Sequence, residues 1–516
     1  MKNLLIKSCV SIVTGTTFLV IPLGFTVHAQ EETKNLNYAD NHEYDNEEKY
    51  KEEIKTKEIK KWEDSLKKED RNILNLATYT ADILKQYDGF MDAAMDIYKR
   101  ETINVNNDSF DDEEEEELKG AIDTVKKLDK LLEEKSMKSK DNIRVYKYLT
   151  KNDVNFDVGN TIYEKNNPTI VDRQKVDLIK KTFKYGVLTT YFDPLLTRPK
   201  QQNRKDMVLL DLKLPKNTPI GFMGKDGQII LQRNQGIEVT NYRIITERGR
   251  EILEIEAKLV NKDTIDEKIK LKENLINDTF KQMIRSKINK SLKNDDKLDE
   301  SISDNRLVKI HTVSLNASYA VDKAEMLLQT LVRNIPNDLF LKTFEKMNPN
   351  TAFYITDSKW STAEYLWGME NSQKEIESES HVLAYYSPSK RDIVLNLSSH
   401  NVEFDPLKIL KDGEEAPASD VQSLLHEFGH AVDNLIFNDV SKSIEFKYLF
   451  NKENANITIE DYAQTNPREF FASVFSYMFS PNVHFRKEIE QQAPETVSYI
   501  KNLILKNNLA SQIDFE

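Results

Sequence analysis

The chain has 516 residues, 39% of them hydrophobic, which is enough for two to four domains with buried cores. Its 86 acidic side chains outnumber the 73 basic ones, and the formal net charge of −13 argues against binding to nucleic acid. The single cysteine excludes a disulfide framework.

The N-terminal stretch has the features of a secretory signal peptide, predicted to span residues 1–29. Lys2 and Lys7 lead into a long apolar run, and a small-residue cleavage site ends at Ala29. The alternative is an uncleaved N-terminal anchor, because the apolar run is long for a signal. We expect a secreted, extracellular protein without stable membrane insertion. Because Cys9 lies in the leader, the mature chain would have no thiol nucleophile or cysteine metal ligand.

The mature chain is expected to begin with an arm and then a domain that combines helices and strands. Residues 30–60 are almost wholly charged or polar, which predicts a flexible, solvated arm. Helical periodicity follows over residues 73–98, and the pattern then changes to short apolar stretches typical of strands. These strands are predicted at residues 144–148, 207–214, 228–231 and 251–256.

The stretch from about residue 62 to 260 resembles the actin-modifying type of bacterial ADP-ribosyltransferase, as in the vegetative insecticidal and iota-type toxins. In that family an active-site arginine follows a Val-Tyr pair, and here Lys147 follows such a pair. Thr189 begins the best match to the family's Ser-Thr-Ser strand, and Asp226 and Gln228 fall at its Glu-x-Glu loop. The resemblance implies a mixed α/β-sandwich domain over residues 61–265, with these four residues at the NAD-site positions.

The residues at these positions depart from the chemistry of the family. Lys147 cannot make the forked, planar contact of arginine with a dinucleotide phosphate, and Gln228 cannot supply the full charge of a glutamate. We therefore expect an inactive transferase domain that binds substrate or a partner. The alternatives are a toxin adaptor that docks on a translocation component, or a working ADP-ribosyltransferase, acting through residues 61–265.

A charged segment and a mixed helix and strand region follow. Residues 266–310 are predicted to form a charged helical linker between two domains. Helical periodicity resumes over residues 314–344 and is broken at Pro336. Residues 381–386 and 392–397 are predicted to form a hairpin. An exposed strand there would hold an extended peptide through main-chain hydrogen bonds, although ordinary sheet packing explains the pattern equally well.

The segment that begins at Ser419 is predicted to be a helix with a metal site. Ser419 and Gln422 have capping-box spacing, and apolar residues recur at helical spacing through the segment. His426 and His430 should therefore lie one turn apart on the same face, where two imidazoles can hold one zinc ion. Glu427 stays outside the ligand set and can face a zinc-bound water, as in a His-Glu-x-x-His metalloprotease.

The third zinc ligand has to come from elsewhere in the chain. An extended metzincin motif would need glycine and histidine at the positions of Asp433 and Ile436. Downstream, Asn466 and Pro467 predict a helix start with Glu469 in its first turn. Glu469 is the best candidate, since two histidines and a glutamate leave the fourth zinc position for water. The alternative is a carboxylate that only complements the helix dipole.

Residues from about 314 to the C-terminus resemble the catalytic domain of the lethal factor and Pro-Pro endopeptidase family. The resemblance rests on His-Glu-Phe-Gly-His-Ala from residue 426, on Tyr462, and on Thr-Asn-x-x-Glu-Phe-Phe-Ala from residue 465. It implies that His426, His430 and Glu469 bind Zn²⁺. It also implies that Glu427 is the general base and Tyr462 an electrophilic hydroxyl, with a core aromatic as the alternative for Tyr462.

These patterns predict an α+β protein of two domains. The first is the ADP-ribosyltransferase-like domain, and the second, over residues 311–516, is a mainly helical zincin domain with a small sheet. The expected activity is that of a secreted, toxin-type zinc endopeptidase acting on a protein or peptide in extended conformation. A host target protein and a translocation component are the expected partners if the protein is delivered to a host cell.

Overall fold

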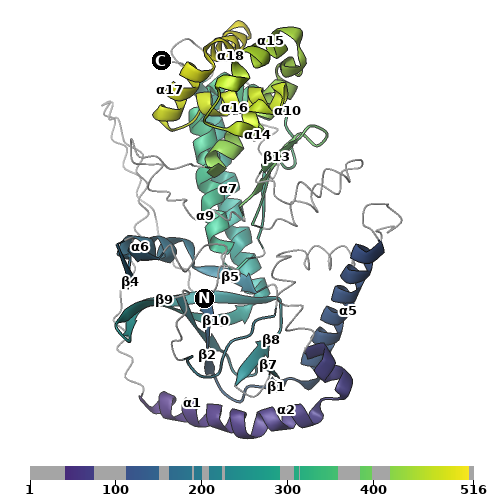
Figure 1. Cartoon of the computed structure of the whole chain (residues 1–516), viewed down its shortest axis with the longest axis vertical. Coiled ribbons are helices and arrows are strands. Elements are labelled where there is room, and N and C mark those ends of the chain that lie inside the picture. The colour runs from purple at the N-terminus through teal and green to yellow at the C-terminus, as the bar shows by residue number, and fades with distance from the viewer. Residues whose placement is uncertain are drawn as a thin grey trace, which may run out of the picture. The chain divides into compact units, whose positions relative to one another are not determined.

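The computed structural model describes most of the chain (Figure 1). The described residues are 41–74, 112–149, 162–164, 166–188, 191–199, 208–223, 227–290, 307–312, 314–315, 317–357, 384–397 and 419–510. In these ranges, helices combine with four separate sheets, which confirms the α+β class predicted from the sequence. No helix within them is both long and apolar enough to cross a membrane. The predicted signal peptide lies outside the described residues.

The N-terminal part is built on a five-stranded sheet of order β2-β6-β10-β9-β5. Its strands are β2 (Ile143–Leu149), β5 (Tyr185–Leu188), β6 (Val208–Leu214), β9 (Gln235–Glu247) and β10 (Arg250–Asn261). β6 and β10 are parallel, and the other neighbours are antiparallel. β6 is buried along almost its whole length, which explains its nearly continuous apolar sequence. Its one acid, Asp211, accepts a hydrogen bond of 2.8 Å from Arg144 of β2.

Two smaller sheets complete the strands of this part. β1 (Met137–Lys138), β7 (Pro219–Met223) and β8 (Gln228–Leu231) form one, and β3 (Tyr163–Glu164) and β4 (Asn167–Val171) form the other. This part also contains the helices α1 (Asn41–Glu53), the π-helix η1 (Ile54–Glu58), α2 (Ile59–Ser65), α5 (Asp112–Lys135) and α6 (Arg173–Thr182). The four predicted strands are thereby confirmed as β2, β6, β8 and β10. The helix predicted over residues 73–98 lies almost entirely outside the described residues.

The prediction of a flexible arm is wrong for residues 41–60, which are helical. Ile54 and Ile59 are buried, and the ring of Trp62 packs edge-on against Phe222 with centroids 6.1 Å apart. Much of the charge of this segment is paired within the helix, as between Lys51 and Glu47 at 3.0 Å. A few apolar residues at helical spacing are therefore enough to pack the highly polar residues 47–60 against the core.

The predicted charged linker is also a packed helix where the structure describes it. Helix α7 (Lys262–Lys290) buries six apolar side chains, namely Ile265, Ile269, Ile276, Phe280, Ile284 and Ile288. On the buried face, Asn277 exchanges hydrogen bonds with the main chain of Val308, and Glu273 accepts one of 2.7 Å from the Ile310 amide. The charged residues mark the exposed face, and α7 is part of the core rather than a solvated connection.

The C-terminal part contains a four-stranded sheet of order β11-β12-β14-β13. β11 (Val308–His311), β12 (Phe353–Thr356) and β14 (Asp392–Asn396) run parallel, and β13 (Ala384–Ser387) is antiparallel to β14. β13 and β14 confirm the predicted hairpin. Among the described residues β13 pairs only with β14, so it is an edge strand. Helices α9 (Ala317–Asn334) and α10 (Asn337–Lys346) are separated at Pro336, as predicted.

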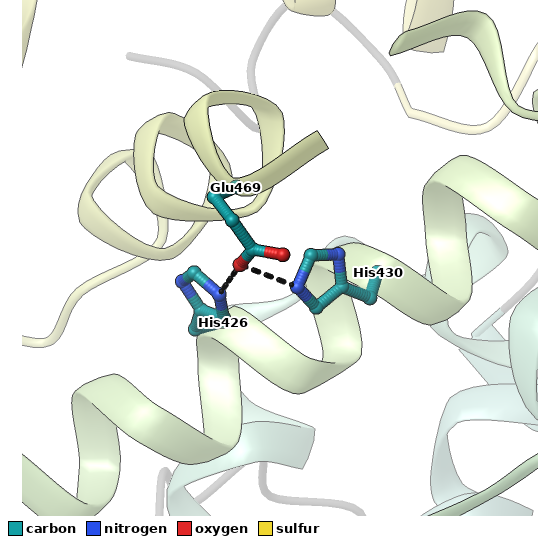
Figure 2. A group of neighbouring side chains, drawn as sticks. All are labelled: His426, His430 and Glu469. Atoms are coloured by element: carbon teal, nitrogen blue, oxygen red, sulfur yellow. Dashed lines mark hydrogen bonds and ion pairs between the residues drawn. The ribbon is translucent and has the colours of Figure 1, made fainter. Parts of the chain in front are cut away.

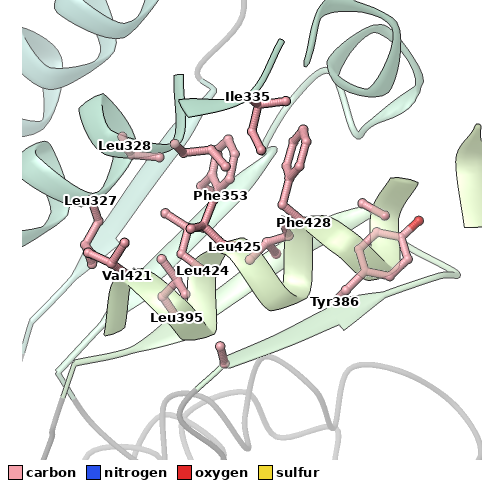
Figure 3. Packing of buried hydrophobic residues seen from close by; sticks show 14 of the residues in the cluster. Leu327, Leu328, Ile335, Phe353, Tyr386, Leu395, Val421, Leu424, Leu425 and Phe428 are labelled. Atoms are coloured by element: carbon pink, nitrogen blue, oxygen red, sulfur yellow. The ribbon is translucent and has the colours of Figure 1, made fainter. Parts of the chain in front are cut away.

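The remaining helices contribute many of the buried residues of the C-terminal core. They are α14 (Ser419–Leu435), η2 (Val440–Lys442), α15 (Ile444–Glu453), η3 (Asn454–Asn456), η4 (Asp461–Gln464), α16 (Pro467–Met478), α17 (Val483–Gln492) and α18 (Pro494–Lys506). Figure 3 shows the packing around α14, where Leu424 and Phe428 lie among residues of α9 and of the sheet, including Leu328 and Phe353. The apolar face of α14 is thereby fixed against α9 and the sheet. This packing also fixes the orientation of the polar residues of α14, among them His426 and His430.

Candidate metal and peptidase site

Helix α14 positions two of the predicted metal ligands. Its apolar residues are buried as expected; they are Val421, Leu424, Leu425, Phe428 and Val432. His426 and His430 are one turn apart and 7% and 5% exposed. The capping-box prediction is wrong for Gln422, because its side chain donates a hydrogen bond to the Ser476 hydroxyl of α16 instead of reaching back to the helix start.

Helix α16 positions the third predicted ligand. The side chain of Asn466 caps it by accepting hydrogen bonds of 3.0 Å and 3.1 Å from the amides of Arg468 and Glu469. Pro467 occupies the first helical turn, where its missing N–H costs nothing. The helix start predicted from the sequence is confirmed, and it places Glu469 in the first turn facing α14.

The three predicted ligands converge (Figure 2). One carboxylate oxygen of Glu469, Oε2, lies 3.0 Å from Nε2 of His426 and 3.0 Å from Nε2 of His430. One ligand atom of each residue lies within 4.8 Å of those of the other two. Tetrahedral ligands about 2 Å from a common zinc ion are separated by roughly 3.3 Å, so the donor types and their spacing fit this metal.

The electrostatics of the cluster suit a bound cation. Burial alone would raise the pKa of Glu469, but hydrogen bonds from His426 and His430 hold this pKa well below its ordinary value. Burial would lower the pKa of His426, yet the hydrogen bond to Glu469 and the nearby charge of Glu427 raise it. In the metal-free protein these shifts favour an ionised Glu469 carboxylate beside a protonated His426, and a metal ion would replace that proton.

The outer nitrogens of the two imidazoles have different surroundings. Nδ1 of His426 lies 3.3 Å from the hydroxyl of Ser473, which is on α16 one turn after Glu469. Nδ1 of His430 is buried and has no hydrogen-bond partner among the described residues. Ser473 was not predicted from the sequence, although its position four residues after Glu469 on the same helix face was a usable signal.

The structure also brings the two predicted catalytic residues to this cluster. Glu427 is 8% exposed, and its Oε2 accepts a hydrogen bond of 2.6 Å from the main-chain amide of Tyr386 in β13. Tyr462, in η4, is 54% exposed, and its ring centroid lies 6.0 Å from that of His426. Burial of the hydroxyl, with help from nearby carboxylates, raises the pKa of Tyr462 to about 12. The hydroxyl therefore stays protonated at neutral pH and can donate a hydrogen bond.

The predicted NAD-site positions can be judged at two of four residues. Lys147 donates a hydrogen bond of 2.6 Å to one oxygen of Asp193, and Gln228 donates one of 3.0 Å to the other. The ammonium group of Lys147 also lies 4.5 Å from the centre of the Phe192 ring. Sequence reasoning missed Asp193, since nothing local marks it as a partner of both residues. Thr189 and Asp226 lie outside the described residues.

Two family descriptions match separate parts of the chain. "Anthrax toxin lethal factor, N- and C-terminal domain" matches residues 305–503, and "Anthrax toxin lethal factor, middle domain" matches residues 105–260. The resemblance to lethal factor that the sequence motifs predicted is therefore confirmed, and it extends beyond the metal site.

Individual relatives agree with these matches. Lethal factor of Bacillus anthracis is 28% identical over 375 residues, which cover 70% of this chain and 42% of lethal factor. A Pro-Pro endopeptidase of Clostridioides difficile is 38% identical over 79 residues, which cover 15% of this chain and 36% of that protein. The chain thus spans less than half the length of either relative.

Two solved structures of ADP-ribosylating toxins are also similar to part of the chain. BECa of C. perfringens, solved with NADH, has a TM-score of 0.33 and 16% identity and covers 41% of this chain and 47% of BECa. C3larvin of Paenibacillus larvae has a TM-score of 0.30 and 22% identity and covers 40% of this chain and 94% of C3larvin.

Proposed function

We propose that this chain is a secreted, toxin-type zinc endopeptidase. The observation that carries the proposal is the convergence of His426, His430 and Glu469 on one point, with Glu427 on the same helix as the histidines. The similarity to lethal factor and to a Pro-Pro endopeptidase supports the same reaction class. His426, His430 and Glu469 would hold Zn²⁺, which when bound supplies a Lewis acid that polarises a carbonyl oxygen and acidifies water.

Glu427 serves as the general base in this proposal. One of its oxygens is occupied by the Tyr386 amide, so the other is available to take a proton from the attacking water. The same carboxyl group then passes this proton to the leaving amine. Its 8% exposure keeps bulk water away and preserves the strength of these contacts.

Tyr462 donates its hydroxyl proton as a hydrogen bond to the oxyanion that forms when the scissile carbonyl is attacked. Its side chain is half exposed beside His426, so it can reach a substrate that lies over the metal ligands. Because its pKa is about 12, the hydroxyl donates without losing its proton throughout the neutral range.

The substrate binds in extended form along the edge strand β13. The amide of Ile393 in β14 points to Ala352, on the side of β12, so Ile393 and Tyr386 are not a hydrogen-bonded pair. By alternation, the amide and carbonyl of Ala384 and the carbonyl of Tyr386 face away from β14. These groups can form main-chain hydrogen bonds with a peptide that lies along the edge of the sheet as an additional strand. That peptide would pass beside the metal-ligand helix. The natural substrate in this proposal is a protein, in a host or on a bacterial surface.

The N-terminal domain, over residues 61–265, acts in binding and not in NAD chemistry. The charge of Lys147 is neutralised by Asp193, and Gln228 is held by the same carboxylate, so neither side chain is free to contact a dinucleotide. The domain would instead bind substrate or a translocation component, and the peptidase domain would begin near residue 311. NAD consumption by the full chain above the rate of a buffer control would refute this part of the proposal.

Peptide-library cleavage by the purified mature chain tests the main proposal. We expect cleavage that a chelator abolishes and added zinc restores. Glu427→Gln should keep zinc at wild-type stoichiometry and lose about a thousandfold or more in turnover, whereas His426→Ala should lose both zinc and activity. Tyr163→Phe, a variant of a buried tyrosine in the N-terminal part, serves as a matched control. Chelator-resistant cleavage, or full activity of Glu427→Gln, would contradict the assignment.

A further inference from the structure

Tyr386 connects the edge strand β13 to helix α14 at two separate points. Its main-chain amide donates a hydrogen bond of 2.6 Å to Oε2 of Glu427. Its side-chain hydroxyl donates a hydrogen bond of 3.0 Å to Oδ1 of Asn434. The side chain is fully buried, and Figure 3 shows its ring standing beside the helix that carries Phe428. The residue therefore uses both its main chain and its side chain to hold the same helix.

The spacing of the two acceptors explains why one residue can reach both. Glu427 and Asn434 are seven residues apart, which is about two turns, so they lie on nearly the same face about 10 Å apart along the axis. The long side chain of a tyrosine covers this separation together with the two hydrogen bonds and the side chains of Glu427 and Asn434. A shorter residue at position 386 could keep the contact with Glu427 but would lose the one with Asn434.

Asn434 is itself held in the orientation that this contact needs. Its Nδ2 donates a hydrogen bond of 3.0 Å to Oδ1 of Asp439, which leaves Oδ1 of Asn434 to accept from the tyrosine. Asp439 has a left-handed backbone with φ of 58°, and its amide donates to the carbonyl of Asp433 at 2.8 Å. The turn after α14 is thus shaped so that it fixes the amide group facing Tyr386.

We propose that Tyr386 is a positioning residue that holds the Glu427 carboxylate by one oxygen and fixes the register of β13 against the metal-ligand helix. The inference rests on the proposed peptidase function, because it assigns Glu427 a reacting oxygen and β13 a bound peptide. A glutamate side chain has three rotatable bonds, and a short hydrogen bond to the charged oxygen restricts them. With Oε2 held, Oε1 is the oxygen left to accept the proton of the attacking water, and a substrate strand paired with β13 would meet it at one fixed residue.

Hydrogen exchange at the Tyr386 amide tests the first contact without any need for activity. In the metal-free full chain, Glu427→Ala removes the acceptor and should speed exchange of this amide by about tenfold or more, whereas Glu427→Gln keeps an acceptor oxygen and should change it by less than about threefold. Equal exchange in wild type, Glu427→Ala and Glu427→Gln would overturn the contact.

Steady-state kinetics test the second contact. Tyr386→Phe and Asn434→Ala should each lower kcat by roughly tenfold, with KM and zinc content close to wild type, and the double variant should be no worse than either one. Tyr163→Phe, which removes a hydroxyl hydrogen bond to the Glu251 carbonyl, should leave kcat unchanged. A kcat for Tyr386→Phe and Asn434→Ala equal to wild type would overturn the role in catalysis. Failure of the wild-type chain to cleave any peptide would instead refute the proposed function, and the exchange experiment would still decide the contact.

Discussion

The Cα of Ala472 lies only 3.2 Å from the point where a Cβ atom on Gly429 would stand. Helices α14 and α16 therefore touch through a glycine, in the same turn of α14 that carries His426 and His430. Phe475 Cδ1 is 3.1 Å from the same point, so a Cβ atom on Gly429 would also meet the Phe475 ring. This approach is what allows Glu469, in the first turn of α16, to reach both imidazoles.

Gly429→Ala should weaken metal binding even though alanine is the better helix former. In an exposed helix the change would stabilise by about 1 kcal/mol. Here the added methyl group meets the backbone of Ala472, so α16 has to move, and we expect a net loss of about 1–3 kcal/mol in unfolding free energy and roughly tenfold in zinc affinity. Chemical unfolding and competition with a zinc indicator measure the two effects.

Gly249→Ala is the matched control for this change. Gly249 has φ of 78° and no atom within 4 Å of an added Cβ, so the variant should lose stability through backbone strain and keep its zinc affinity. A Gly429→Ala protein that is more stable than wild type and binds zinc equally well would contradict the close approach of the two helices.

Ser473→Ala should lower zinc affinity by about tenfold, because it removes the hydroxyl that lies 3.3 Å from Nδ1 of His426. When Nε2 of this histidine faces a metal, Nδ1 carries the proton and needs an acceptor. Ser476→Ala is the control. The Ser476 hydroxyl donates a hydrogen bond to the Ser473 carbonyl and accepts one from the Gln422 side chain, and neither partner is a predicted metal ligand. Equal zinc affinity of the Ser473→Ala and wild-type proteins would show that the Ser473 hydroxyl does not support His426 in metal binding.

The convergence of the three predicted ligand side chains could be predicted because its signals are local. His426 and His430 follow from helical spacing, and Glu469 follows from the cap and proline that begin its helix. Tyr386 and Asp193 could not be predicted, because their contacts depend on tertiary packing: 41 residues separate Tyr386 from Glu427, and 46 separate Asp193 from Lys147.

The same limit explains one error in the fold prediction, the flexible arm, and one feature that it missed, the burial of one face of the predicted helical linker. In residues 41–60 and in α7, charged residues outnumber the apolar ones that are buried, so composition favoured a solvated arm and a linker. Helical spacing of the few apolar residues, such as Ile54 and Ile59 or Ile265 and Ile269, was the better guide, since one narrow apolar face is enough to pack a helix.

Tyr462→Phe should lower kcat by about tenfold to a hundredfold and leave zinc content unchanged, because it removes a donor to the oxyanion but no metal ligand. The half-exposed ring keeps its packing beside His426, so stability should change little. Since the pKa of Tyr462 is about 12, the wild-type rate should not fall through loss of this proton below pH 11. A wild-type rate in the Phe variant would place Tyr462 among packing residues.

The metal-free cluster should make stability depend on pH in a direction opposite to that of the zinc form. The pKa of His426 is raised above 6.5. Its contribution to the unfolding free energy is therefore complete below pH 6.5 and is lost as the pH rises through the pKa that this group has in the folded protein. The pKa of Glu469 is lowered from 4.5. Its contribution to the unfolding free energy is therefore present above pH 4.5 and is lost as the pH falls through the pKa that this group has in the folded protein. Both contributions are therefore complete between pH 4.5 and 6.5.

Urea unfolding of the metal-free wild type and of Glu469→Gln should show this window. The difference in unfolding free energy between the two proteins should be larger near pH 5.5 than near pH 8, because the variant lacks the carboxylate that shares a proton with His426. With saturating zinc the stabilisation should instead grow from about pH 5.5 to about pH 8, since metal binding requires deprotonated imidazoles. A metal-free difference that grows with pH would show that the Glu469 carboxylate and His426 do not share a proton.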